Sequence, residues 1–204
     1  MKSYPSISAE IQNIDVYCFP KYDGSNLRAE WSRKQGFYKF GSRTRLLDRD
    51  EKPLGEGMTL FLERYEKSLS ECFKSERYES AICFFEFFGK NSFAGLHQDE
   101  PHQVIVFDIA PHKKGILPPQ DYLRLAKKYC LDVSLPIYHG NANSDFINQV
   151  KNGTLPGMTF EGVVCKSNPL KKGQMPNMFK VKNIAWYLKL KERCQSEEEF
   201  ESLK

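Results

Sequence analysis

A lysine followed closely by an Asp-Gly pair, in the stretch Lys21-Tyr22-Asp23-Gly24-Ser25-Asn26, is the first candidate for chemistry in this sequence. An aromatic and β-branched run precedes it and an alternating run follows it, so the lysine falls where one expected strand turns into the next. Burial and neighbouring positive charge would lower the pKa of such a lysine from about 10.4 toward neutrality. The uncharged amine would then be a nucleophile held on a rigid backbone.

Two glutamates and two lysines stand in apolar, strand-like runs further along the chain, at Glu86, Glu161, Lys180 and Lys182. A buried carboxylate is costly without a partner, so each glutamate should face a cleft, a cation or a hydrogen-bonding ligand. Lys180 and Lys182 are two residues apart on one expected strand, so their side chains project to the same side. Two adjacent ammonium groups repel each other unless an anion lies between them, and a phosphoryl group undergoing displacement is such an anion.

Together these side chains predict nucleotidyl transfer through a lysine–phosphorus bond. The paired lysines would neutralise charge on the reacting phosphoryl group. The two carboxylates would bind sugar hydroxyls or order the water shell of Mg2+, which usually keeps several waters.

The elements that must position these residues follow from hydrophobic periodicity. Strands are predicted as a three-strand meander over 14–43, as neighbouring strands at 81–88 and 103–109, and as two more at 158–167 and 178–183. Helices are predicted from just after Gly55-Glu56-Gly57 to Phe73, from 118 to about 129, from 143 to 153, through 186–188, and from 196 onward. Without a repeat or a linker, we expect one α+β domain over residues 1–204, with antiparallel sheets flanked by helices.

The composition is that of a soluble, globular protein. The chain has 204 residues, of which 40 % are hydrophobic and 27 % charged, and it contains no apolar run long enough for a membrane span. The first residues lack a secretory signal, and six scattered cysteines without a CxxC pair are typical of reduced core thiols. We therefore expect an intracellular monomer, cytoplasmic or nuclear. Thirty basic residues and a net charge of +4 permit a nucleic-acid partner.

Six segments of the sequence resemble, in order, the motifs of the covalent nucleotidyltransferases, the superfamily of polynucleotide ligases and mRNA capping enzymes. The stretch from Lys21 to Gly24 resembles motif I, KxDG. The others are Ser42-Arg43 (motif Ia), Phe85-Glu86-Phe87-Phe88-Gly89 (motif III), Val106-Phe107-Asp108-Ile109 (motif IIIa), Glu161-Gly162-Val163-Val164 (motif IV) and Lys180-Val181-Lys182 (motif V). With Asn26, the first segment is most similar to the nick-sealing phage type of ATP-dependent RNA ligase.

This resemblance implies an adenylyltransferase fold, of the ATP-grasp-like ligase catalytic type, and an RNA ligase that uses ATP with Mg2+ or Mn2+. The nucleophilic lysine would attack the α-phosphorus of ATP, form lysyl-AMP and release pyrophosphate. The AMP would then pass to an RNA 5′-phosphate, and a 3′-hydroxyl would displace it. The implied partners are RNA ends or a nicked duplex, as in RNA repair, and a viral or phage source is left open.

The resemblance also implies the catalytic residues. Lys21 would be the nucleophile, and Lys180 and Lys182 would contact the α-phosphate. Glu161 would assist the metal, directly or through water, and would contribute to nucleotide binding.

The remaining implied residues bind the nucleotide or the RNA. Asn26 would lie near the reacting phosphate, and Arg43 would contact phosphate or the RNA end. Glu86 would bind the ribose, and Phe107 would stack on adenine.

Two features of the sequence depart from the pattern of that superfamily. The RNA ligase branch often has a glutamate that reads adenine just before the nucleophile, where this chain has Pro20, so base selection would rest on other groups and ATP or GTP stays open. Only about twenty residues follow Lys182, too few for the C-terminal OB domain of DNA ligases and capping enzymes. Either a minimal ligase of one catalytic domain or a fragment fits this length.

Other interpretations stay open beside the resemblance. The chain could be the catalytic domain of a DNA ligase or a capping guanylyltransferase, or a non-catalytic module that binds nucleic-acid ends. Phe107 could be simple core and Ser42-Arg43 ordinary turn chemistry. Trp186 could stack on bases, although core packing is the expected role. His97 and His102 lack a regular element that would bring them together, so no zinc site is expected there.

Overall fold

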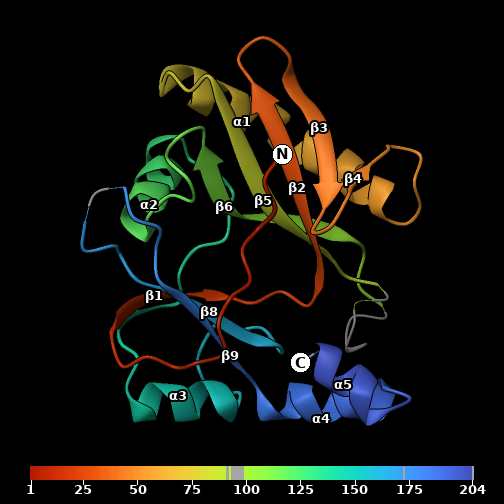
Figure 1. Ribbon diagram of the computed structural model, residues 1–204, viewed down its shortest axis with the longest axis vertical. Coiled ribbons are helices and arrows are strands. Elements are labelled where there is room, and N and C mark those ends of the chain that lie inside the picture. The colour runs from red at the N-terminus through yellow and green to blue at the C-terminus, as the bar shows by residue number, and fades with distance from the viewer. Residues whose placement is uncertain (91, 93–98, 172, 204) are drawn as a thin grey trace.

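The computed structural model describes residues 1–90, 92, 99–171 and 173–203. Its strands form two antiparallel sheets with helices packed beside them, one sheet above the other in Figure 1. The predicted α+β class, with antiparallel sheets flanked by helices, is therefore confirmed.

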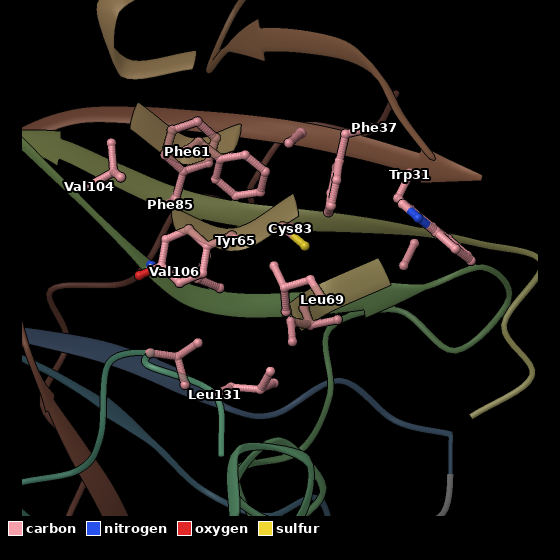
Figure 2. Packing of buried hydrophobic residues seen from close by; sticks show 14 of the residues in the cluster. Trp31, Phe37, Phe61, Tyr65, Leu69, Cys83, Phe85, Val104, Val106 and Leu131 are labelled. Carbon is pink, nitrogen blue, oxygen red and sulfur yellow. The ribbon is translucent and has the colours of Figure 1, made fainter. Parts of the chain in front are cut away.

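The five-stranded sheet has the order β4-β3-β2-β5-β6. Its strands are β2 (Gly24–Ser32), β3 (Gly36–Ser42), β4 (Leu46–Leu47), β5 (Ser80–Phe88) and β6 (Gln103–Pro111). Helix α1 (Leu54–Ser75) covers one face, and its buried side chains recur at the predicted spacing. Figure 2 shows Phe61 and Tyr65 of α1 packed with Phe85 of β5, and the Phe61 and Phe85 ring centroids are 4.5 Å apart. This aromatic core holds the sheet rigid beneath the residues it presents.

The four-stranded sheet has the order β7-β1-β8-β9. Its strands are β1 (Asp15–Pro20), β7 (Tyr138–Asn141), β8 (Gly162–Lys166) and β9 (Met178–Lys182). Helix α3 (Ser144–Lys151) packs against β8 and β9, and helix α2 (Pro119–Lys128) belongs to the core of the other sheet. Four of the six cysteines are buried in these two cores, at Cys18, Cys72, Cys83 and Cys165.

The predicted meander over residues 14–43 is wrong. β1 pairs with β7 and β8 in one sheet, whereas β2 and β3 pair in the other. The Asp-Gly pair therefore does not close a hairpin, and the chain crosses from one sheet to the other at residues 21–23. Partners that lie more than a hundred residues further along the chain decided this, and a local pattern does not contain them.

Two element boundaries also differ from prediction. α1 begins at Leu54 rather than after residue 57. Gly55 lies inside the helix, at a point where a Cβ would be 2.1 Å from the carbonyl oxygen of Arg49. The glycine marks a close approach inside the helix rather than its start. β8 begins at Gly162, so Glu161 stands just before the strand and not within it.

Polar side chains cap both C-terminal helices. α4 (Ile184–Arg193) begins at Asn183, whose side chain accepts a hydrogen bond of 2.9 Å from the backbone of Ala185. α5 (Glu197–Leu203) follows Ser196, whose hydroxyl accepts from the backbone of Glu199 at 3.1 Å. Within the described part of the chain, every helix is too short or too polar to cross a bilayer.

Candidate active site

Residues from both sheets line a cavity of about 610 Å3. All of the residues singled out from the sequence line it: Lys21, Asn26, Arg43, Glu86, Phe107, Glu161, Lys180 and Lys182. They come from four strands and from loops that adjoin three others. The fold thus brings segments spread over the chain to one open cavity.

The backbone of Lys21 is fixed where the chain leaves β1. Its N–H donates a 3.0 Å hydrogen bond to the carbonyl oxygen of Gly162, and its own carbonyl accepts from the hydroxyl of Thr159. Three residues later, β2 approaches β5 so closely that a Cβ at Gly24 would lie 2.2 Å from the carbonyl oxygen of Phe87. The lysine is therefore held between two fixed sheet ends, on a rigid backbone as predicted but not in the predicted hairpin.

Three charged side chains form the centre of the site. The Oε1 atom of Glu161 lies 2.7 Å from the Nζ of Lys21 and 3.1 Å from the Nζ of Lys182. The side chains of Glu161 and Lys182 are 5 % and 4 % exposed, whereas that of Lys21 is 24 % exposed toward the cavity. One carboxylate oxygen thus joins the candidate nucleophile to a second, deeper cation.

The predicted lowering of the pKa of Lys21 is wrong for this state of the protein. Burial by itself lowers that pKa, but the negative charges of Glu161, Glu86 and Asp23 outweigh burial and raise it above its ordinary value. Lys21 is therefore an ammonium ion at neutral pH, and it must lose a proton before it can act as a nucleophile.

The two lysines of β9 have the opposite shift. Burial lowers the pKa of Lys182 to about 8, with help from Lys21 and Lys180 and against the pull of Glu161. The pKa of Lys180 is also lowered, by burial first and then by the charge of Lys21. Both lysines line the cavity, so the prediction that they share one side of their strand is confirmed.

Glu86 and Asn26 face each other across the β2–β5 pairing. Burial raises the pKa of Glu86 to about 8, although the positive charge of Lys21 opposes the rise. The Oδ1 atom of Asn26 is buried, and the described residues offer it no hydrogen-bond donor. A polar ligand in the cavity would satisfy both groups.

Phe107 lies at another part of the cavity wall. Two of its polar neighbours, Tyr4 and Lys166, were not among the site residues predicted from the sequence. Its ring contacts that of Tyr4 edge-on at 5.1 Å, and its carbonyl oxygen accepts a 3.1 Å hydrogen bond from Lys166. Lys166 is buried and forms a 2.7 Å ion pair with Asp108, which also accepts from the hydroxyl of Tyr4 at 2.5 Å. The alternation of Val164 and Lys166 on β8 was the signal available, since both line the cavity.

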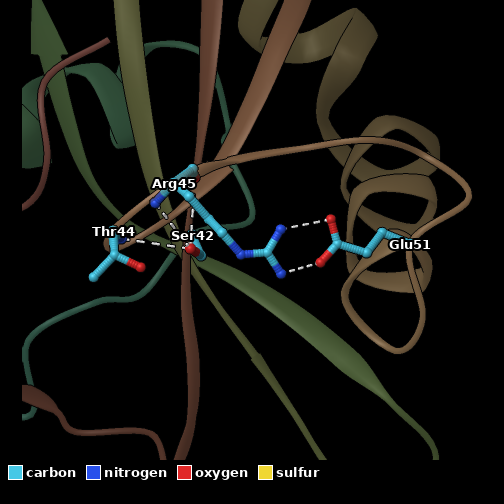
Figure 3. A network of polar contacts seen from close by, with 4 residues as sticks. All are labelled: Ser42, Thr44, Arg45 and Glu51. Atoms are coloured by element: carbon cyan, nitrogen blue, oxygen red, sulfur yellow. Dashed lines mark hydrogen bonds and ion pairs between the residues drawn. The ribbon is translucent and has the colours of Figure 1, made fainter.

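Arg43 projects from a turn that its neighbours hold. The hydroxyl of Ser42 accepts from the backbone N–H groups of Thr44 and Arg45, and the guanidinium of Arg45 pairs with both oxygens of Glu51 (Figure 3). Ser42 thus has the ordinary role in a turn that the sequence allowed for it, since its hydroxyl accepts hydrogen bonds from the turn backbone. The turn leaves Arg43 at the cavity, where its Nη2 donates to the hydroxyl of Ser6 at 2.8 Å.

No set of three or more metal-binding side chains occurs in the part of the chain that is described. His97 lies outside the described residues. His102 forms hydrogen bonds with Glu56 at 2.8 Å and with the carbonyl oxygen of Lys90 at 2.7 Å. Its ring nitrogens are thus both engaged within the protein.

The two sheets and the cavity between them define the nucleotidyltransferase fold of RNA ligases. In particular, the chain is similar to a mutant Naegleria gruberi RNA ligase with AMP and Mn, at 15 % identity and a TM-score of 0.69, over 95 % of this chain and 59 % of that one. A second mutant of that ligase, with ATP and Mn, matches at 16 % identity and a TM-score of 0.65, over 89 % of this chain and 53 % of that one. An archaeal ATP-dependent RNA ligase matches at 16 % identity and a TM-score of 0.65, over 92 % of this chain and 50 % of that one.

The chain spans between 50 % and 59 % of the length of these three ligases. At such identities the likeness establishes the fold. By sequence, no protein-family model and no curated protein matches the chain.

Proposed function

We propose that this chain is the adenylyltransferase domain of an ATP-dependent RNA ligase, with Lys21 as the nucleophile. The observation that carries the proposal is the contact of Glu161 with both Lys21 and Lys182 inside a cavity lined from both sheets. Because both sheets contribute to one cavity, we further propose that residues 1–204 form a single domain. The fold shared with ATP-dependent RNA ligases supports both statements.

In the first step, the uncharged amine of Lys21 attacks the α-phosphorus of ATP. A nitrogen–phosphorus bond forms, the bond from the α-phosphorus to the bridging oxygen breaks, and pyrophosphate leaves with its electron pair. The ammonium groups of Lys180 and Lys182 offset the negative charge that develops on the phosphoryl oxygens. The proton that Lys21 loses passes to solvent.

In the second step, an oxygen of an RNA 5′-phosphate attacks the same phosphorus, and the bond to Lys21 breaks. The lysine takes up a proton, and an RNA with a 5′–5′ linked AMP results. In the third step, a 3′-hydroxyl attacks the 5′-phosphorus and AMP leaves, which joins the two RNA ends. In this scheme the chain's substrate is therefore nucleic acid with a nick or two free ends.

The nucleotide would contact the four remaining candidate residues. Glu86 would accept hydrogen bonds from the ribose hydroxyls, and Phe107 would stack on the base. Asn26 would hydrogen-bond near the reacting phosphate, and its buried Oδ1 atom, which has no donor among the described residues, supports a polar ligand at that point. Arg43, exposed at the cavity, would bind phosphate or the RNA end.

A divalent cation, Mg2+ or Mn2+, fits the site if the nucleotide supplies most of its ligands. Among the described residues Glu161 is the carboxylate that we assign to it, through water, and phosphate oxygens would complete the shell. When bound, the cation supplies positive charge beside Lys21 and the phosphates, which favours the uncharged amine.

The proposal is tested by incubating the protein with α-labelled ATP and Mg2+ and measuring acid-labile label on the chain. Labelling is expected for the unaltered protein and for Lys67→Ala, a control at an exposed lysine of α1. It should disappear in Lys21→Ala and on addition of EDTA. Unaltered protein that never takes up label would refute the proposal.

Three outcomes of labelling, sealing and RNA-binding assays would favour a different function. Label from GTP in place of ATP would favour a capping guanylyltransferase, and sealing of nicked DNA but not nicked RNA would favour a DNA ligase. RNA binding without labelling under any condition would favour a module that recognises nucleic-acid ends.

A further inference from the structure

Trp186 lies behind one of the cationic groups of the site. Its side chain is 2 % exposed, as expected for core packing, but its ring is not in contact with apolar groups alone. The Nζ of Lys182 lies 3.7 Å from the ring centroid. Tryptophan has the aromatic face that attracts cations most strongly, and the attraction grows when the pair is shielded from water.

The backbone fixes this contact together with the carboxylate of the site. Lys182 ends β9, and the next residue, Asn183, donates its N–H to the carbonyl oxygen of Glu161 at 3.0 Å. The side chain of Asn183 also caps α4, which carries Trp186 in its first turn. Glu161, Lys182 and Trp186 are thus positioned by one strand-to-helix junction.

Lys182 needs such support because its surroundings disfavour a fixed cation. Its side chain is 4 % exposed, so water solvates it little, and the ammonium groups of Lys21 and Lys180 repel it. Glu161 attracts it, but that carboxylate also pairs with Lys21. An aromatic face adds attraction without adding a negative charge, so it leaves the positive charge of Lys182 available to a phosphoryl group.

We propose that Trp186 is a positioning residue whose indole face holds the Lys182 ammonium in place for nucleotidyl transfer. This inference rests on the proposed function. It also predicts a property that is measurable without ATP, since the contact is made by two side chains of the chain itself.

Fluorinated tryptophans test the electrostatic part directly, because fluorine removes electron density from the ring face and changes its size little. The chain has two tryptophans, so every protein in the series carries Trp31→Phe. The labelling rate with ATP should fall with each added fluorine, to about 30-fold below the unfluorinated protein, which corresponds to ~2 kcal/mol. The fall should appear in kcat, with KM little changed. A rate independent of fluorination would overturn the inference.

Two substitutions separate this role from packing. Trp186→Phe keeps a ring face and should retain more activity than Trp186→Leu, even when both proteins are equally folded by circular dichroism. In a Lys182→Met background, fluorination of Trp186 should have no further effect on residual labelling. Equal activity of the Phe and Leu variants would contradict a role for the ring.

The contact is also measurable without ATP, which separates this inference from the proposed function. In Trp31→Phe protein, Trp186 is the one remaining fluorophore of its kind. Lys182→Met should shift its emission, because an ammonium ion over the ring changes the field on the excited indole. Lys189→Met, on the exposed side of α4, is the matched control. Identical spectra with and without Lys182 would overturn the contact, whatever the outcome of labelling.

Discussion

The Nζ of Lys21 and the Oε1 of Glu161 lie 2.7 Å apart where the two sheets meet. This ion pair keeps the candidate nucleophile charged and places it within reach of whatever enters the cavity. In the proposed reaction, nucleotide binding must therefore weaken the pair before chemistry begins.

The first prediction concerns the alkaline side of the labelling reaction. Because the pKa of Lys182 is about 8, this side chain loses its positive charge as the pH rises through that value. Labelling should therefore rise with pH up to about 8 and then level off, because the gain from deprotonation of Lys21, whose pKa is higher, is offset by the loss of charge on Lys182. Lys182→Arg keeps its charge at these pH values, so its labelling should continue to rise. Initial rates from pH 6 to 10 provide the measurement.

Lys189→Arg, at an exposed lysine of α4, is the control for the pH profile and should behave as the unaltered protein. The same plateau above pH 8 in Lys182→Arg would show that another group causes it.

The second prediction concerns stability at Glu86. Its pKa is raised from 4.5 to about 8, so the folded protein holds a proton there that the unfolded chain releases. Stability should therefore decrease as the pH rises from about 5 to 8, by at most about 1.4 kcal/mol per pH unit. Glu86→Gln removes this dependence, so its stability relative to the unaltered protein should increase over that range. Urea unfolding at several pH values measures it.

An exposed glutamate of α1, changed in Glu66→Gln, serves as control for the effect of Glu86. If the two variants gained stability equally with pH, the assignment to Glu86 would be wrong.

The third prediction concerns the glycine of the KxDG segment. Gly24→Ala would place a Cβ 2.2 Å from the carbonyl oxygen of Phe87, and backbone of a central strand has little room to move. We expect a loss of more than about 3 kcal/mol in the free energy of unfolding. Gly36→Ala, where a Cβ meets open space and only a positive φ opposes it, should lose about 1 to 2 kcal/mol. Equal losses would show that β2 and β5 can separate.

The fourth prediction concerns the ion pair of Asp108 and Lys166, which are 1 % and 2 % exposed. Asp108→Asn leaves the lysine buried without its counter-charge and should destabilise the fold by about 3 to 5 kcal/mol. Replacing both residues, in Asp108→Leu with Lys166→Met, should restore part of that loss. Glu79→Gln breaks an exposed pair with Arg33 and should change stability by less than about 1 kcal/mol. A double variant no more stable than Asp108→Asn would contradict the argument.

Local patterns in the sequence predicted local structure well. The buried face of α1, the Asn143 cap of α3 and the Ser196 cap of α5 depend on residues within a few positions of each other. Strand pairing depends on residues that can be far apart in the sequence, and for that reason the predicted meander was wrong. The short strand β7, which pairs with β1, has a sequence, Tyr138–Asn141, without a hydrophobic pattern that marks it.

The sequence by itself indicated the chemically distinctive side chains of the candidate site. Residue types and their order along the chain indicated Lys21, Glu86, Glu161, Lys180 and Lys182, and these residues line one cavity. They could be recognised because a nucleophile, carboxylates and paired cations stand out in apolar strands. Only the tertiary structure decided their protonation and their further neighbours. The pKa of Lys21 rises, and Trp186 lies against Lys182, because Coulomb and cation–π interactions depend on distances that folding sets.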